Sequence, residues 1–326
     1  MRQGQFREGT IPWIFVTAIL VTNALILATT TWLLSARDQA TEVTQGQVLD
    51  EFRADLVAGV EPLEAPTTPS QAPTTPAPSA RPTLSPADGA TVASEAPAAE
   101  APSSQGVPST PTPSSSPTPL GYRQPQAGVY EYATTGSESV SLMGAKHQYP
   151  SRTYASVQVG DGCGWRLELK IVAEHVDEWL MCSDAGWLVR AGHTRTITWF
   201  GVTTDGYYDC GEPLVHDGRD VVVDDTITYP GCTDGAGSFA DIDVTLLERG
   251  SFLVSGDTVQ AISVEVVMHS SGTTRGLTTD RYWLAADTGM ILHLDRQVDT
   301  TSDTQFGKVD YQERATFTLT SLTPST

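Results

Sequence analysis

A proline-rich stretch over residues 62–120 constrains this chain most, because it divides the chain into parts that must fold separately. It holds 15 of the 21 prolines and contains no aromatic residue. Segments dominated by Pro, Ala, Thr and Ser bury too little apolar surface to offset the entropy of ordering. We therefore expect residues 62–120 to form a disordered Pro/Ser/Thr/Ala-rich linker with a bias toward the polyproline II conformation.

Residues 11–34 form an apolar, uncharged stretch near the N-terminus. A helix of this length would span about 36 Å, which exceeds the roughly 30 Å hydrocarbon core of a bilayer. Trp13 and Trp32 lie near its two ends, where indole side chains favour the membrane interface. Because cleavable signal peptides have a shorter apolar region, of about 7–15 residues, we expect an uncleaved transmembrane signal-anchor.

The charges around this stretch predict its orientation. Arg2 and Arg7 precede it and only Arg37 follows it closely, so the positive-inside rule favours a cytoplasmic N-terminus over residues 1–10. All four cysteines come after the linker, and disulfides persist in oxidising compartments. We expect a single-pass plasma-membrane protein whose linker holds an extracytoplasmic C-terminal domain away from the bilayer.

The juxtamembrane segment, residues 35–61, has apolar side chains at three- and four-residue spacings, which predicts a short amphipathic helix. These are Val48, Leu49, Phe52, Leu56 and Val60. The helix could lie on the bilayer or form a stalk. The default expectation is a marginal helix with no partner, because isolated helices of this length are barely stable in water.

Residues 121–326 predict one mostly β domain, because apolar and polar side chains alternate along several segments. The apolar positions of these segments are Thr153, Ala155, Val157 and Val159; Ile242, Val244 and Leu246; Ile262, Val264, Val266 and Met268; and Val309, Tyr311, Ala315, Phe317 and Leu319. No convincing amphipathic helix follows residue 121. Strands with one polar face indicate an antiparallel sheet, and we expect it to be curved or to form a half-barrel that protects its edges.

The cysteines support a hairpin between Cys163 and Cys182. Folding this segment about Val172–Ala173 places the two cysteines directly opposite each other, within disulfide range. The same register sets Trp165 opposite Leu180 and Leu169 opposite Val176.

Cys210 and Cys232 bracket a second segment that could close in the same way. Four cysteines allow three pairings, and we predict Cys163–Cys182 with Cys210–Cys232. The rival, a zinc site, is disfavoured because the chain has neither a CxxC nor an HxxxH spacing.

A resemblance emerges at Trp283, Thr288 and Gly289. The run WLAADTGMILHL resembles the W-x-x-x-x-T-G-L-x-x-R hairpin of half-barrel lipoprotein carriers and lipid-binding envelope proteins of the LolA and LprG type. The Asp-Pro before that turn and the Leu-Pro after it are absent here. Residues 127–326, with the opening GVYEYATTG, also resemble membrane-anchored actinobacterial envelope proteins, a resemblance that implies no activity.

No catalytic motif is visible, so we expect no enzyme activity and no cofactor. The six histidines are scattered along the chain, at 147, 175, 193, 216, 269 and 293. His269 and His293 lie on the polar sides of their strands, and we expect both to face solvent.

Loops rich in aspartate raise the question of a calcium site. The best candidates are Asp234, Asp241 and Asp243, but they lack the DxDxDG spacing, and solvated turn aspartates are the commoner reading. We therefore predict no metal site. The net charge of −20 argues against nucleic acid, whose binding depends on neutralising phosphates.

Aromatic residues are the remaining functional clue. They could line a lipid or sugar pocket or fill a sheet core, and they are Trp165, Trp179, Trp187, Trp199, Trp283, Tyr207 and Tyr208. The leading hypothesis is a membrane-tethered envelope binding module for a lipid or other apolar ligand. The alternative is a structural or regulatory envelope protein that contacts cell-wall polymers or protein partners.

Overall fold

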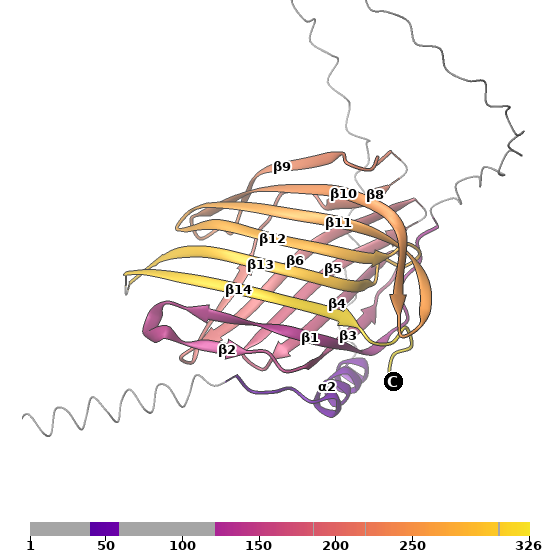
Figure 1. The fold of residues 1–326 in the computed structure, drawn as a ribbon, viewed down its shortest axis with the longest axis horizontal. Helices are drawn as coiled ribbons and strands as arrows, with labels where there is room; N and C mark the ends of the chain where they lie inside the picture. Colours follow the sequence, from indigo (N-terminus) through magenta and orange to yellow (C-terminus); the bar gives the residue numbers. More distant parts are fainter. Residues whose placement is uncertain (1–39, 59–120, 185, 219, 306) are drawn as a thin grey trace, which may run out of the picture. The chain divides into compact units, whose positions relative to one another are not determined.

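The computed structural model describes residues 40–58 and 121–326, apart from residues 185, 219 and 306. The expected signal-anchor at 11–34 and linker at 62–120 lie outside these residues. Within the described ranges, no helix combines the length and the apolar character needed to cross a membrane. The described residues fold into one 14-residue α-helix and a large antiparallel sheet (Figure 1).

The elements follow one another along the chain, beginning with helix α2 (Gln45–Ala58). The remaining elements are β1 (Gly128–Val140), the short 3-10 helix η1 (Leu142–Gly144), β2 (Lys146–Gln148), β3 (Arg152–Val159), β4 (Gly164–Val172), β5 (His175–Asp184), β6 (Trp187–Trp199), β7 (Val202–Tyr207), β8 (Leu214–Gly218), β9 (Thr226–Thr233), β10 (Ser238–Val254), β11 (Asp257–Gly272), β12 (Thr274–Ala285), β13 (Ile291–Thr304) and β14 (Gly307–Leu319).

The strands form one 14-stranded sheet in which most neighbours are consecutive in sequence. Its order is β7-β6-β5-β4-β3-β1-β14-β13-β12-β11-β10-β9, with β2 paired to β1 and β8 paired to β6. All pairings are antiparallel. The prediction of a mostly β, antiparallel, curved sheet is therefore confirmed.

The sheet closes further than a half-barrel, because its two edges meet at a seam. Asp209, just after β7, and Thr233, at the end of β9, exchange two backbone hydrogen bonds of 2.9 Å each. The disulfide between Cys210 and Cys232 crosses the same seam. The result is a nearly closed barrel (Figure 1). Closure removes exposed sheet edges that would otherwise pair with other chains.

Both predicted disulfides are present, but the predicted register of the first hairpin is wrong by one residue. Gly164, not Cys163, lies opposite Cys182, and Trp165 lies opposite Met181. The turn falls at Ala173 and Glu174, and the ladder is irregular just before it. The cysteine Cα atoms are still only 4.8 Å apart, so the disulfide forms from a diagonal position.

The second disulfide does not close a hairpin, which corrects the other expectation. Within the segment that it brackets, β8 pairs with β6 and β9 pairs with β10. Cys210 and Cys232 therefore join the two edges of the sheet rather than two strands of one hairpin.

The expected alternation places a continuous apolar layer inside the barrel. Leu246, Val264, Tyr282, Leu294 and Phe317 follow one another directly across strands β10 to β14, and all are buried. Four residues before Phe317 on the same interior face, the layer becomes polar. Glu313 of β14 lies there opposite Glu138 of β1, and both are fully buried.

Helix α2 packs on the outer face of the barrel and thus has the partner that the sequence did not reveal. Val48 and Phe52 are buried in a small cluster with Val129 of β1, and Tyr154 of β3 packs against it. Leu56, which the periodicity placed on the same apolar face, is exposed.

Polar contacts also attach α2 to β3, to β4 and to the C-terminal end of the chain. Lys170 of β4 forms an ion pair with Glu51, and Gln158 of β3 donates to Asp55. Gln45 donates to Ser325, near the C-terminus.

Candidate functional site

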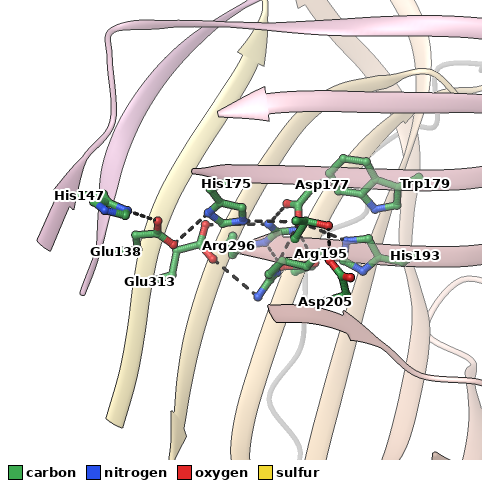
Figure 2. Close-up of polar contacts among 12 residues, drawn as sticks. Glu138, His147, His175, Asp177, Trp179, His193, Arg195, Asp205, Arg296 and Glu313 are labelled. Carbon is green, nitrogen blue, oxygen red and sulfur yellow. Dashed lines mark hydrogen bonds and ion pairs between the residues drawn. The ribbon is translucent and has the colours of Figure 1, made fainter. Parts of the chain in front are cut away.

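A cluster of buried ionisable side chains fills part of the barrel interior (Figure 2). Its members, called the polar cluster below, are Glu138, His147, His175, Asp177, His193, Arg195, Asp280, Arg296 and Glu313. They come from β1, β2, β5, β6, β12, β13 and β14, so the cluster joins strands on opposite sides of the barrel. Burying so many charges is costly unless each is paired, which makes their pairing the central question.

Glu138 anchors one side of the polar cluster. Its carboxylate oxygens lie 2.7 Å from His147 Nδ1 and 2.9 Å from His175 Nδ1. The Tyr311 hydroxyl donates to the same carboxylate at 2.7 Å. The His147 ring also stacks on Trp199, with centroids 3.8 Å apart. These contacts tie β1, β2, β5 and β6 together.

Asp177 and Arg296 form the centre of the polar cluster. The Arg296 guanidinium pairs with Asp177 and also with Asp280, through Nε at 2.9 Å and Nη2 at 3.1 Å. It lies 5.8 Å above the Trp179 ring, a cation–π arrangement. Asp177 accepts a second hydrogen bond from Arg195 Nε at 3.2 Å.

Glu313 completes the polar cluster on β14. The Tyr149 hydroxyl donates to it at 2.9 Å, and Tyr311 donates at 3.2 Å. Arg195 Nη1 lies 3.7 Å from the same carboxylate and Arg296 Nη1 lies 3.9 Å from it. Every carboxylate of the polar cluster therefore has at least two polar partners.

The pKa shifts follow from this pairing. Burial alone would lower the pKa of His175, but Glu138 and Asp177 raise it to about 10. Burial would raise the pKa of Glu138, yet His175 and the bonds from His147 and Tyr311 bring it well below its usual range. His175 is therefore a cation and Glu138 an anion at neutral pH.

A buried arginine outside the polar cluster, Arg190 of β6, lies on the same interior face and is 6% exposed.

Arg190 lacks the pairing that the other buried arginines have. Arg190 Nη1 lies 3.5 Å from the Tyr282 hydroxyl, and no carboxylate in the described ranges forms an ion pair with it. Tyr282 in turn donates to Asp280 at 2.9 Å. Within the described part of the chain, Arg190 thus connects to the polar cluster through the neutral Tyr282 hydroxyl.

Two histidines beside Arg190 have unused ring nitrogens. His216 of β8 is 2% exposed, and neither of its nitrogens has a hydrogen-bond partner among the described residues. Its ring centroid lies 6.0 Å from that of Tyr282. His193 stacks on Trp179, and its Nε2 lies 3.7 Å from Asp177, beyond hydrogen-bond distance. We call Arg190, His193, His216 and Tyr282 the arginine–histidine site.

The strand pairing of β6 is interrupted next to the arginine–histidine site. On the seam side of β6, pairing with β8 ends at Arg190 and pairing with β7 begins at Thr194. In these ladders the residues 191–193 have no partner on that side. On its other side β6 carries a bulge opposite Leu180 and Met181. Bulges redirect side chains and are common beside binding sites. The His193 side chain is 20% exposed, so solvent reaches this position.

Both histidines of the arginine–histidine site are neutral at pH 7. Burial, together with Arg190 and Arg296, lowers the pKa of His193 to about 4 against the opposing effect of Asp177. Burial and Arg190 likewise hold the pKa of His216 well below its ordinary value. A neutral imidazole has one N–H donor and one acceptor nitrogen, so each ring can still bond a ligand.

No family model, curated protein or solved structure matches this chain. The proposed resemblance to half-barrel lipid carriers therefore stays a prediction. Its local element is a turn between β12 and β13, where Gly289 has the expected positive φ of 75°. The Trp283 side chain of that motif contacts Phe252, with ring centroids 5.7 Å apart.

The histidines are not scattered, which corrects the interpretation from the sequence. His147, His175, His193 and His216 all lie inside the barrel. For two of them the sequence held a signal, because residues two apart on a strand lie on the same face. His175 shares its face of β5 with Asp177 and Trp179, and His193 shares its face of β6 with Arg195. His269 is exposed as predicted, whereas His293 is half-buried and bonded to Thr318.

The predicted calcium candidates use their carboxylates for local hydrogen bonds. Asp234 accepts from the backbone N–H groups of Ala236 and Ser238, Asp241 from that of Gly231, and Asp243 from the Thr228 hydroxyl. In the described part of the chain, no group of three His, Cys, Asp or Glu side chains is arranged to hold a metal ion.

The aromatic candidates divide between several environments. Trp165 and Trp179 are buried in the interior, Trp199 stacks on His147, and Trp187 is 40% exposed. Trp179 is the one that contributes to the arginine–histidine site, through its stacking on His193. The aromatic residues thus do not gather into a single apolar pocket.

Proposed function

We propose that this chain is a membrane-anchored, extracytoplasmic binding module that takes a small anionic ligand inside its barrel. The observation that carries the proposal is Arg190, a buried guanidinium with no carboxylate partner in the described residues, beside the unused nitrogens of His216. A buried charge without a counter-charge is costly, and a carboxylate, phosphate or sulfate group would remove that cost.

The chemistry of the interior favours a polar ligand over the apolar one that the sequence suggested. A lipid tail gains free energy by contacting hydrocarbon surface, whereas the interior beside the unpaired part of β6 presents Arg190, His193 and His216. The arginine–histidine site offers donors at fixed positions, which is how polar groups orient a small ligand in a protein site.

The proposed location of the module follows from the sequence. Residues 11–34 would anchor it in the plasma membrane, and two disulfides suit an oxidising compartment outside the cytoplasm. We propose binding without catalysis and without a cofactor.

Anion binding is tested on the purified full chain in detergent. Inorganic phosphate, sulfate and citrate are titrated by calorimetry, with thermal unfolding as a second readout. We expect saturable binding and a raised Tm, because a ligand that binds only the folded state stabilises it. The Arg190→Gln variant should lose both effects.

The matched control is Arg275→Gln, which removes an exposed arginine that pairs with Asp303. It should bind as the parent chain does. Equal responses of parent, Arg190→Gln and Arg275→Gln would mean that the anions act on the general surface, and the proposal would be wrong. Recovery of a tightly bound lipid by native mass spectrometry would instead support the apolar ligand.

A second candidate function rests on the outer face of the barrel. A shallow groove of about 440 Å³ crosses β1 and β11 to β14. Its polar lining includes Thr135, Arg281, Asp295, Gln297, Arg314 and Thr316. Such a surface fits a polar wall polymer or a protein partner. Co-sedimentation with purified cell wall, lost in an Arg281→Ala/Arg314→Ala variant, would support this function.

A further inference from the structure

The first described residues of the chain bind the turn between β4 and β5. The Thr41 backbone N–H and hydroxyl both donate to the Glu174 carboxylate at 2.7 Å, and the Ala173 N–H donates to the Thr41 carbonyl at 2.9 Å. From there the chain continues into α2, which is held by Val48, Phe52 and their neighbours. Residues that precede the proline-rich stretch, from Thr41 through α2, therefore pack against the barrel.

Because Thr41 and α2 already pack on the barrel, the segment between the barrel and the expected membrane anchor is short. Only residues 35–39 separate the end of the apolar stretch from the described chain. Six Cα–Cα steps at about 3.4 Å span at most ~20 Å. Residues 59–120 leave the barrel domain at Ala58 and rejoin it at Gly121, so they do not lie between anchor and barrel.

Three turns lie together at the end of the barrel where Thr41 attaches. They are 141–145 between β1 and β2, 173–174 between β4 and β5, and 200–201 between β6 and β7, and we call this the Thr41 end. The Thr198 N–H donates to the Glu174 carbonyl at 2.7 Å, and the His147 ring stacks on Trp199. These contacts join the three turns.

Exposed apolar side chains project from the Thr41 end. Met143 is 55% exposed and Val202 is 64% exposed. Met143 and the neighbouring turn residue Phe200 have left-handed φ values of 56° and 54°, which are uncommon for non-glycine residues. Backbone strain of this kind is often found at functional positions.

Cations accompany these apolar residues. The chain has three lysines, and two of them, Lys146 and Lys308, are exposed in or beside the turns of the Thr41 end. Of the acidic groups at this end, Glu174 bonds Thr41 and Asp303 pairs with Arg275, while Glu42, Asp205 and Asp310 are exposed. Apolar tips beside lysines suit the interfacial region of a bilayer, where the ammonium groups can reach lipid phosphates.

We propose that the Thr41 end rests on the outer surface of the bilayer, with α2 as the joint that holds it there. Met143 and Val202 would reach the headgroup region. The proline-rich stretch comes after α2 in the sequence, so its length would not set the height of the barrel above the membrane. The inference depends on the proposed membrane anchor but not on the anion site.

The test uses the full chain in vesicles of equimolar phosphatidylcholine and phosphatidylglycerol. A single added cysteine, Met143→Cys or Asp287→Cys, is labelled with a fluorophore, and nitroxide headgroup lipids serve as quenchers. Asp287 lies in the turn between β12 and β13 at the opposite end of the barrel. We expect loss of fluorescence at position 143 and little loss at position 287.

Two further chains identify the joint. Inserting a second copy of residues 66–118 after Pro119 should leave the quenching at position 143 unchanged. The Val48→Asp/Phe52→Asp variant, which detaches α2, should lose that quenching. Equal quenching at both labels, or loss of quenching on lengthening the linker, would overturn the inference. Failure of the chain to associate with vesicles would overturn the anchor as well, whereas anion binding in detergent is measured separately.

Discussion

Arg296 on β13 forms a buried ion pair with Asp177 on β5, on a distant wall of the barrel. The two residues are 119 positions apart in sequence, and Asp280 holds the same guanidinium from β12. This bridge passes through the barrel interior, where apolar side chains would otherwise pack. It fixes the relative positions of the two walls with directional contacts, since a guanidinium and two carboxylates bond in few geometries.

Replacing Arg296 with Met should therefore destabilise the barrel strongly. The substitution keeps much of the side-chain volume but leaves Asp177 and Asp280 without their main counter-charge. Removing one partner of a buried pair costs about 3–5 kcal/mol. Urea unfolding, monitored by tryptophan fluorescence, measures the loss.

The control is Arg275→Met, which breaks the exposed pair with Asp303 and should cost at most about 1 kcal/mol. An Arg296→Met chain as stable as this control would show that the bridge contributes no net stability.

Stability should also fall as the pH rises above neutrality. The pKa of His175 is about 10 in the folded chain against an ordinary value of 6.5. A raised folded pKa gives stability that is complete below pH 6.5 and is lost as the pH rises through about 10. Tyr149 and Tyr311 face His175 and Glu138, and their raised pKa values keep them neutral over this range.

Thermal unfolding at pH 7, 8, 9 and 10 measures this loss. The His175→Gln variant, which cannot titrate, should start with a lower Tm and show a flatter profile. Parallel profiles for both chains would mean that His175 is not the group responsible.

The sequence predicted the sheet because its signal is local. Alternating apolar residues such as Ile262, Val264 and Val266 do face the interior. Cysteine pairing was also accessible, because both disulfides close short loops of 19 and 22 residues. Both predictions needed only neighbouring segments.

The polar cluster escaped prediction because of a register error of one residue. Since side chains alternate between faces, that slip exchanged the two sides of β5. It placed Val176 opposite Leu169 and turned Asp177 outward, whereas Asp177 lies opposite Leu169 and faces the interior. Neither side of β5 is purely apolar, so its composition did not resolve the choice.

Two further features depend on which separate elements meet in space. The seam joins Asp209 to Thr233 through one isolated bridge, and α2 packs on strands more than 70 residues later in the sequence. Alternation and helical periodicity describe single segments, so neither indicates which surfaces meet.

Removing the Cys210–Cys232 disulfide should loosen the seam more than removing the Cys163–Cys182 disulfide loosens the β4–β5 hairpin. The two loops have similar lengths, so removing either disulfide should cost about 3 kcal/mol through chain entropy. Beyond that cost, the Cys210→Ser/Cys232→Ser variant also releases the only bridge at the seam among the described residues. Hydrogen exchange should speed up at the amides of Asp209 and Thr233.

In the Cys163→Ser/Cys182→Ser variant, the amides of β4 and β5 should stay protected, because their ladder remains. Equal protection of the seam in both variants would contradict a seam that depends on its disulfide.

Anion binding at the arginine–histidine site should strengthen as the pH falls from 7 toward 5. His193 has a pKa of about 4 and the pKa of His216 is also lowered, so both rings are neutral when the site is empty. A bound anion favours the imidazolium form and raises both pKa values, so binding takes up protons. Linkage then requires tighter binding at lower pH.

Sulfate is the suitable probe, because its own charge does not change in this range. Calorimetry in two buffers of different ionisation enthalpy gives the proton uptake directly, and the His216→Phe variant should take up fewer protons. A sulfate affinity that is the same at pH 5 and pH 7 would exclude the histidines from the site.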